Sequence, residues 1–143
     1  MFDLACHCGQ LRLHVAKRPD FLHECNCSLC AKTGAHWAYL DPAEVRVEGD
    51  SAAYRRTDKA EPGADIHHCP ACGCVTHFTL TESAVAKFGN VVMGVNMRLA
   101  EEEALAGIEL RYPDGRGWSG EGTFDYVRAA RIIGDDPTGG SEG

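Results

Sequence analysis

The stretch "CHCGQLRLHV", residues 6–15, combines two features that decide the fold. Its first part places Cys6 and Cys8 one residue apart, and its second part alternates leucine and valine with polar residues. That alternation is the two-residue period of a strand with one buried face. Because zinc takes four ligands in a tetrahedron, a cysteine pair of this kind needs a second pair from a distant part of the chain.

A second pair is available in "CPACGC", which contains Cys69, Cys72 and Cys74. Gly73 suits a metal-binding turn, because glycine can adopt the positive φ that turns backbone N–H groups toward sulfur. We therefore predict a closed four-thiolate zinc site at Cys6, Cys8, Cys69 and Cys72. The alternative, a thioredoxin-like redox pair in "CPAC", requires a helix starting at the first cysteine, whereas glycine and the strand-like "VTHFTL" follow here.

A third cluster, "CNCSLC", supplies Cys25, Cys27 and Cys30 and has no obvious fourth protein ligand. Three protein ligands and one open position are typical of catalytic zinc sites, whereas structural sites are closed. Cys74 is the competing explanation, because it could complete this trio and make both metals structural. The spacing leaves both interpretations open.

The rest of the chain favours a mainly β fold of antiparallel sheets. Alternating or β-rich segments recur between turn signals, namely "AHWAYL", "VRVEG", "AAYRRT", "DIHHC", "CVTHFTL" and "VVMGVN". Only "LTESAVAKFG" and "RLAEEEALAG" could be helices. We expect one domain over residues 1–134, and a flexible C-terminal tail over the Gly-rich, acidic residues 135–143.

Composition limits the partners and the location of the protein. The net charge of −7 and the scattered positions of the 14 basic residues argue against nucleic acid as a partner. No apolar run approaches the roughly 18–20 residues that a transmembrane helix needs, so no membrane partner is expected. The first cysteine follows "MFDLA" directly, which leaves no room for a signal peptide and favours a cytoplasmic location. In that reducing compartment, closely spaced cysteines more often bind metal than form disulfides.

The ordered set "CHCGQLRLHV", "CNCSLCAKTGAHWAYL" and "CPACGCVTHF", followed by "VNMRL" and "YPDGRGW", resembles the glutathione-dependent formaldehyde-activating enzyme family, which includes centromere protein V. The resemblance covers about residues 4–118. It implies a zinc-stapled β-tent fold and two zinc ions per chain. It also implies a carbon–sulfur lyase, run in reverse as S-(hydroxymethyl)glutathione synthesis from glutathione and formaldehyde. In this family's terms, the structural zinc would be held by Cys6, Cys8, Cys69 and Cys72, and the second zinc, whose open position takes the thiol, by Cys25, Cys27 and Cys30.

Several further residues are candidates for contact with such a thiol. Lys32 and Arg98 could pair with the carboxylates of a glutathione-like ligand. Trp37 and Tyr39 could line a substrate cleft, although core packing explains them equally well. Two other functions stay open: a module that binds glutathione or another thiol without turnover, and a structural zinc domain that meets a protein partner.

Overall fold

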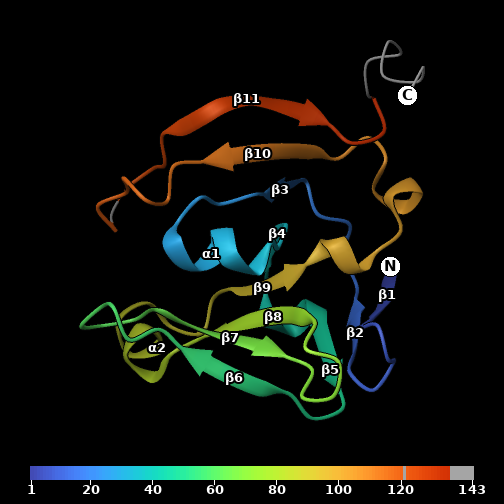
Figure 1. Cartoon of the computed structure of the whole chain (residues 1–143), viewed down its shortest axis with the longest axis horizontal. Coiled ribbons are helices and arrows are strands. Elements are labelled where there is room, and N and C mark those ends of the chain that lie inside the picture. The colour runs from blue at the N-terminus through green and yellow to red at the C-terminus, as the bar shows by residue number, and fades with distance from the viewer. Residues whose placement is uncertain (121, 136–143) are drawn as a thin grey trace.

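Two β-sheets make up most of the computed structural model, which describes residues 1–120 and 122–135 (Figure 1). The predicted mainly β, single-domain fold with few helices is confirmed. Apart from Asp135, the predicted tail lies outside the described residues, and the domain boundary stays a prediction. None of the described helices is long and apolar enough to cross a membrane.

The small sheet has the strand order β1-β2-β5, and the large sheet has the order β11-β10-β3-β4-β9-β8-β7-β6. The strands of the small sheet are β1 (Phe2–Ala5), β2 (Arg12–Val15) and β5 (Val45–Glu48). The strands of the large sheet are β3 (Phe21–His23), β4 (Trp37–Leu40), β6 (Ala52–Arg55), β7 (Ala64–His68), β8 (Val75–Leu80), β9 (Met93–Asn96), β10 (Glu109–Pro113) and β11 (Tyr126–Ile132). The helices are α1 (Ser28–Thr33) and α2 (Glu82–Phe88), with three 3-10 turns η1 (Pro42–Glu44), η2 (Met97–Leu99) and η3 (Glu102–Leu105).

One of the two candidate helices forms and the other does not. The segment "LTESAVAKFG" contains α2, which Thr81 caps by accepting from the backbone N–H of Ala84. The segment "RLAEEEALAG" instead breaks into η2 and η3, because Ala100 between them is extended. The guanidinium of Arg18 also donates to the carbonyls of Ala104 and Ala106, at 3.2 and 2.6 Å, and so ties this segment down in its irregular form.

One pair of neighbouring strands departs from the antiparallel pattern and positions the trio. β10 runs parallel to β3, with Glu109 opposite Phe21. The ladder continues one step beyond β3, where the backbone N–H of Glu24 donates to the carbonyl of Arg111 at 2.9 Å. The first cysteine of the trio is the next residue, so the segment that carries the trio leaves the sheet directly beside β10.

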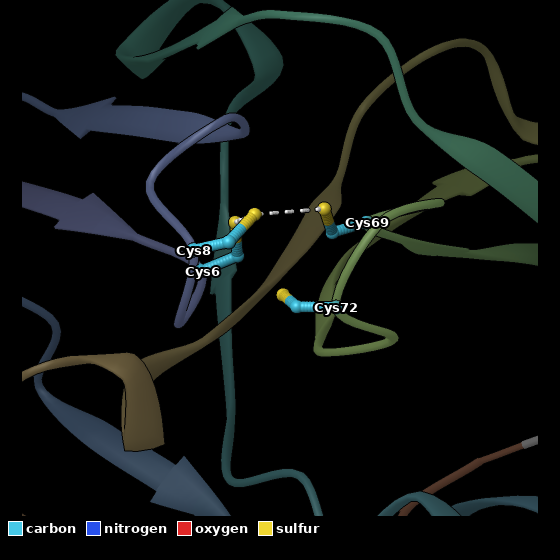
Figure 2. Close-up of side chains that lie close together, drawn as sticks. All are labelled: Cys6, Cys8, Cys69 and Cys72. Atoms are coloured by element: carbon cyan, nitrogen blue, oxygen red, sulfur yellow. Dashed lines mark hydrogen bonds between the residues drawn. The ribbon is translucent and has the colours of Figure 1, made fainter.

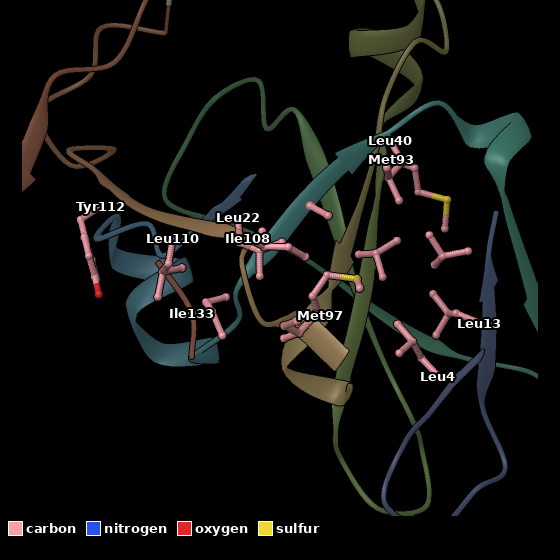
Figure 3. Close-up of a cluster of buried hydrophobic side chains, with 14 residues drawn as sticks. Leu4, Leu13, Leu22, Leu40, Met93, Met97, Ile108, Leu110, Tyr112 and Ile133 are labelled. Atoms are coloured by element: carbon pink, nitrogen blue, oxygen red, sulfur yellow. The ribbon is translucent and has the colours of Figure 1, made fainter. Parts of the chain in front are cut away.

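The main hydrophobic core draws side chains from both sheets (Figure 3). Leu13 and Val15 of the small sheet and Leu22 and Val95 of the large sheet are fully buried. Burying a side chain of this size stabilises the fold by about 1.5–3 kcal/mol. The alternating residues that predicted the first strand therefore serve to pack the small sheet onto the large one.

Candidate metal centres

Two turns of the same design carry the four cysteines of the predicted structural site. Cys6 opens the turn between β1 and β2, and Cys69 opens the turn between β7 and β8. In each turn a glycine N–H donates to the carbonyl of that cysteine, from Gly9 at 3.1 Å and from Gly73 at 2.8 Å. Both glycines have positive φ, 83° and 79°, as expected for Gly73. A backbone N–H also reaches the sulfur of Cys6 and of Cys69, each at 3.4 Å.

The two turns bring their sulfurs together, so that the side chains point toward one another (Figure 2). The Sγ of Cys8 lies 3.6 Å from the Sγ of Cys6 and 3.6 Å from that of Cys69, and all four sulfurs lie within 4.8 Å of one another. Zn–S bonds of about 2.3 Å in a tetrahedron put two sulfurs about 3.8 Å apart, whereas a disulfide needs about 2.05 Å. The four cysteines are free thiols, and this group could hold a metal ion.

Cys74 lies with this group and not with the trio. It packs against the buried cluster of Cys6, Leu11 and Cys69, and its backbone N–H lowers the pKa of Cys72 to about 5. The alternative in which Cys74 completes the trio is therefore wrong. The redox-pair alternative also lacks its structural context, because Cys69 lies in a turn between two antiparallel strands and does not begin a helix.

The trio is assembled within six residues, in the loop after β3 and the first turn of α1. Cys27 is the N-cap of α1, and its Sγ accepts from the backbone N–H of Cys30 at 3.3 Å. The Sγ of Cys25 accepts from the N–H of Cys27 at 3.5 Å. The three sulfurs lie within 4.8 Å of one another and could hold a metal ion. Within residues 1–120 and 122–135, no histidine, cysteine, aspartate or glutamate joins this group as a fourth ligand.

The three thiols are electrostatically coupled. Hydrogen bonds from Cys25 and then from Cys30 lower the pKa of Cys27, so this sulfur carries negative charge most readily. Conversely, the same contacts raise the pKa of Cys25 and Cys30. Because the thiolate is the form that ligates metal, and metal binding releases the remaining thiol protons, this donor set suits a soft dication such as zinc.

A loop from the far end of the chain packs directly on the trio. Asn26 holds it from both sides: its Nδ2 donates to Asp114 Oδ1 at 2.9 Å, and its Oδ1 accepts from the N–H of Arg116 at 2.9 Å. Between these two contacts lies Gly115, where an added Cβ would stand 2.3 Å from the Sγ of Cys25. The loop therefore fits the trio only because residue 115 has no side chain.

A pocket of about 330 Å³ opens beside the trio. Cys25 and Cys30 line it, together with Glu24, Asn26, Ala31, Gly34, Arg98, Tyr112, Val127 and Arg128. Of the predicted thiol-binding residues, Arg98 lies in this lining, whereas Lys32 and Trp37 do not. Lys32 is exposed on the last turn of α1, and Trp37 is 1% exposed and packs edge-on against Phe78 at 5.0 Å between ring centroids.

Tyr39 and His23 form a second buried layer near the trio. The Tyr39 hydroxyl lies 3.1 Å from His23 Nδ1. Burial raises the pKa of Tyr39, and the charge of Cys25 raises it further, so the phenol keeps its proton. Burial lowers the pKa of His23 to about 4, so this imidazole is neutral at neutral pH.

The family model for glutathione-dependent formaldehyde-activating enzymes matches residues 1–107. The chain belongs to this family. A crystal structure of a Rhodobacter sphaeroides protein, a structural-genomics target, is similar to it with 27% identity and a TM-score of 0.56. The similarity covers 70% of this chain and 88% of that one. No curated protein matches the chain.

Membership of the formaldehyde-activating family accounts for both cysteine groups, but not for the whole pocket. Tyr112, Val127 and Arg128 lie beyond residue 107, where the family match ends. Sequence reasoning missed these residues, as well as Asn26 and the steric role of the glycine in "YPDGRGW". The only signal was the "DG" pair, which indicates a turn and says nothing of what the turn contacts.

Proposed function

We propose that the protein is a zinc-dependent carbon–sulfur lyase of the S-(hydroxymethyl)glutathione synthase type, which joins a glutathione-like thiol to a small aldehyde such as formaldehyde. The observation that carries this proposal is a group of three thiols without a fourth protein ligand, next to a pocket of about 330 Å³. That volume is at the lower end of the range for small-molecule sites. Family membership supports the thiol and the aldehyde.

We propose two zinc ions per chain, with different tasks. Cys6, Cys8, Cys69 and Cys72 form a closed set, which suits a structural metal. Cys25, Cys27 and Cys30 would hold the second zinc, whose chemistry when bound is to deprotonate an incoming thiol and to fix the thiolate. Three thiolates already offset the metal's charge, so it would polarise a carbonyl less strongly than zinc held by three neutral histidines.

The reaction is an addition without a change of oxidation state. The thiol sulfur bonds to the carbonyl carbon, the C=O π bond breaks, and the proton lost from sulfur ends on the former carbonyl oxygen. The chain's contribution is mainly position, because two reactants held in the right geometry can gain roughly 7–11 kcal/mol in the best cases. The pocket wall would supply that geometry, and the loop held by Asn26 would keep the Cys25 sulfur in place.

We also propose that the protein works in the cytoplasm. All eight cysteines are free, and reduced thiols persist in that compartment. Glutathione-like thiols are the proposed substrate, so metal site and substrate require the same reducing conditions.

The test begins with native mass spectrometry of protein purified without chelators, with and without excess glutathione. The expected result is two zincs per chain and one bound glutathione. Exchange NMR with ¹³C-formaldehyde and glutathione then measures the interconversion of free and thiol-bound formaldehyde. The proposed activity requires an exchange rate that rises in proportion to protein concentration above the spontaneous rate.

Two cysteine variants make this test specific. Cys27→Ser should remove one zinc, the glutathione adduct and the rate increase, whereas Cys74→Ser, outside both groups, should keep all three. Bound glutathione without a rate increase would leave a thiol-binding module. Two zincs without an adduct would leave a structural zinc domain.

A further inference from the structure

Two arginines in the pocket beside the trio have no acidic partner. Arg98 and Arg128 both line this pocket, and neither forms an ion pair in the part of the chain that the structure describes. The chain carries a net charge of −7, and its arginines at positions 46, 55, 56 and 111 are each paired with a carboxylate. Two unpaired guanidinium groups in one pocket therefore stand out as a site for an anionic group.

Arg98 is placed by a buried hydrogen-bond network. The side chain of Asn96, 7% exposed, accepts from the backbone N–H of Arg98 and of His36, each at 3.1 Å, and donates to the carbonyl of Val75 at 2.8 Å. This fixes η2 and the direction in which Arg98 leaves it. The "VNMRL" segment thus delivers a guanidinium to the pocket from a rigid base.

His36 leaves the donors of Arg98 free. Its Nε2 lies 2.9 Å from Glu24 Oε1 and 3.3 Å from Arg98 Nη1. The shorter contact is the hydrogen bond, with Nε2–H donating to the carboxylate, so this nitrogen cannot also accept from Arg98. Glu24 lines the pocket as well, and its charge is engaged by His36.

Arg128 comes from a strand that the family match does not include. β11 pairs with β10, and Arg128 stands opposite Tyr112 across this pair. Its guanidinium carbon lies 5.0 Å from the centroid of the Tyr112 ring, within the range of a cation–π contact. The ring, which also lines the pocket, holds the guanidinium at the pocket wall without using its N–H donors.

We propose that Arg128 and Arg98 together bind a carboxylate of the thiol substrate, so that the β10–β11 hairpin sets the specificity of this chain. The proposal rests on the proposed function for the position of the sulfur at the trio, and it adds that the ligand is a small thiol that carries a carboxylate. Glu24 repels an anion, which directs the carboxylate to the arginines. An ammonium group on the same ligand would be tolerated near Glu24.

The first experiment compares small thiols of different charge on zinc-loaded protein whose metal content has been verified. The three ligands are 3-mercaptopropionate, 2-mercaptoethanol and cysteamine, and isothermal titration calorimetry gives their affinities. The expected order is 3-mercaptopropionate first, by roughly tenfold over the neutral thiol, because a charge-assisted bidentate contact is the added interaction. Equal affinities for the three thiols would overturn the proposal.

Variants then assign the effect to the arginines. Arg128→Gln and Arg98→Gln should each weaken 3-mercaptopropionate by roughly tenfold and change 2-mercaptoethanol by less than about twofold. Arg128→Lys keeps the charge but not the bidentate geometry and should recover part of the loss. Arg46→Gln, which removes the same charge from the exposed face of β5, should change neither ligand. A uniform loss for all thiols would contradict the assignment.

A thiol-free ligand separates this inference from the proposed function. S-methylglutathione keeps the carboxylates but has no thiol to ligate a metal. It should bind to Cys27→Ser protein, which lacks the trio's metal, and the additional Arg128→Gln change should weaken that binding. This result would sustain the carboxylate site even if the proposed activity failed. No binding, or binding indifferent to Arg128, would refute it.

Discussion

The contact between Gly115 and the trio gives the sharpest prediction, because a single methyl group tests the geometry of the second metal site. In Gly115→Ala the new Cβ would lie 2.3 Å from the Sγ of Cys25 and 3.3 Å from the Cβ of Cys27. Ordinary contacts between such atoms begin at about 3.5 Å, so one side has to retreat by roughly 1 Å. The loop cannot easily do so, because Asn26 holds it on both sides of residue 115 at 2.9 Å.

The sulfur is therefore the group that moves, and its movement damages the metal site. Cys25 can turn its Sγ away from residue 115 only by rotating about one side-chain bond, which takes the sulfur away from those of Cys27 and Cys30. Overpacking of this kind costs about 1–3 kcal/mol. If this cost falls on the metal-bound state, the affinity of the trio for zinc drops by about 5- to 140-fold.

The assay is zinc transfer to a colorimetric chelator, with the four-cysteine group as an internal standard. In Gly115→Ala one zinc should leave at a lower chelator concentration than in the wild type, and the other should be unchanged. Gly63→Ala is the matched control, because an added Cβ there meets nothing within 4 Å and the φ is not positive. Two identical transfer curves for Gly115→Ala and wild type would refute the reasoning.

Three further predictions concern the rest of the molecule. Cys69→Ser should remove one zinc and lower the midpoint of thermal unfolding, whereas Cys27→Ser should remove one zinc with little change in that midpoint, as native mass spectrometry and calorimetry can check. Burial lowers the pKa of His77 to about 3, so below the unfolded-state value of about 6.5 only the unfolded chain takes up this proton. Between pH 7 and pH 5 the free energy of unfolding should therefore fall by about 2 kcal/mol more in the wild type than in His77→Gln, as measured by urea unfolding. Leu22→Ala, at a fully buried core position, should lower the free energy of unfolding by about 2–5 kcal/mol, and a loss below 1 kcal/mol would contradict the core described above.

The parts of this molecule that the sequence predicts are those governed by short-range pattern. The two-residue alternation in residues 11–17 predicts β2, and the glycine after "CPAC" predicts a turn with positive φ. Counting thiol donors separates a set of four from a set of three. Each of these inferences depends on residues a few positions apart, where the chain's local geometry decides the outcome.

The parts that the sequence does not predict depend on pairing between distant segments. The parallel pairing of β3 with β10 joins residues near position 22 to residues near position 110, and no local pattern marks it. Tyr112 and Arg128 enter the pocket through this pairing, and Gly115 meets Cys25 for the same reason. Trp37, predicted to contact a thiol, lies in the core because β4 is an inner strand of the large sheet.

The two cysteine groups differ in how they depend on the fold, and this difference suits their proposed tasks. Cys8 and Cys69 are 61 residues apart, and their turns belong to different sheets, so a metal here ties the small sheet to the large one. Closing a loop of that length constrains the unfolded chain by about 4 kcal/mol in the entropic treatment, against about 2 kcal/mol for the short trio segment. Metal binding at the four-cysteine group is therefore coupled to assembly of the domain. The trio spans only Cys25 to Cys30, so its metal contributes less to chain closure, and a ligand can join or leave it while the four-cysteine group keeps the sheets together.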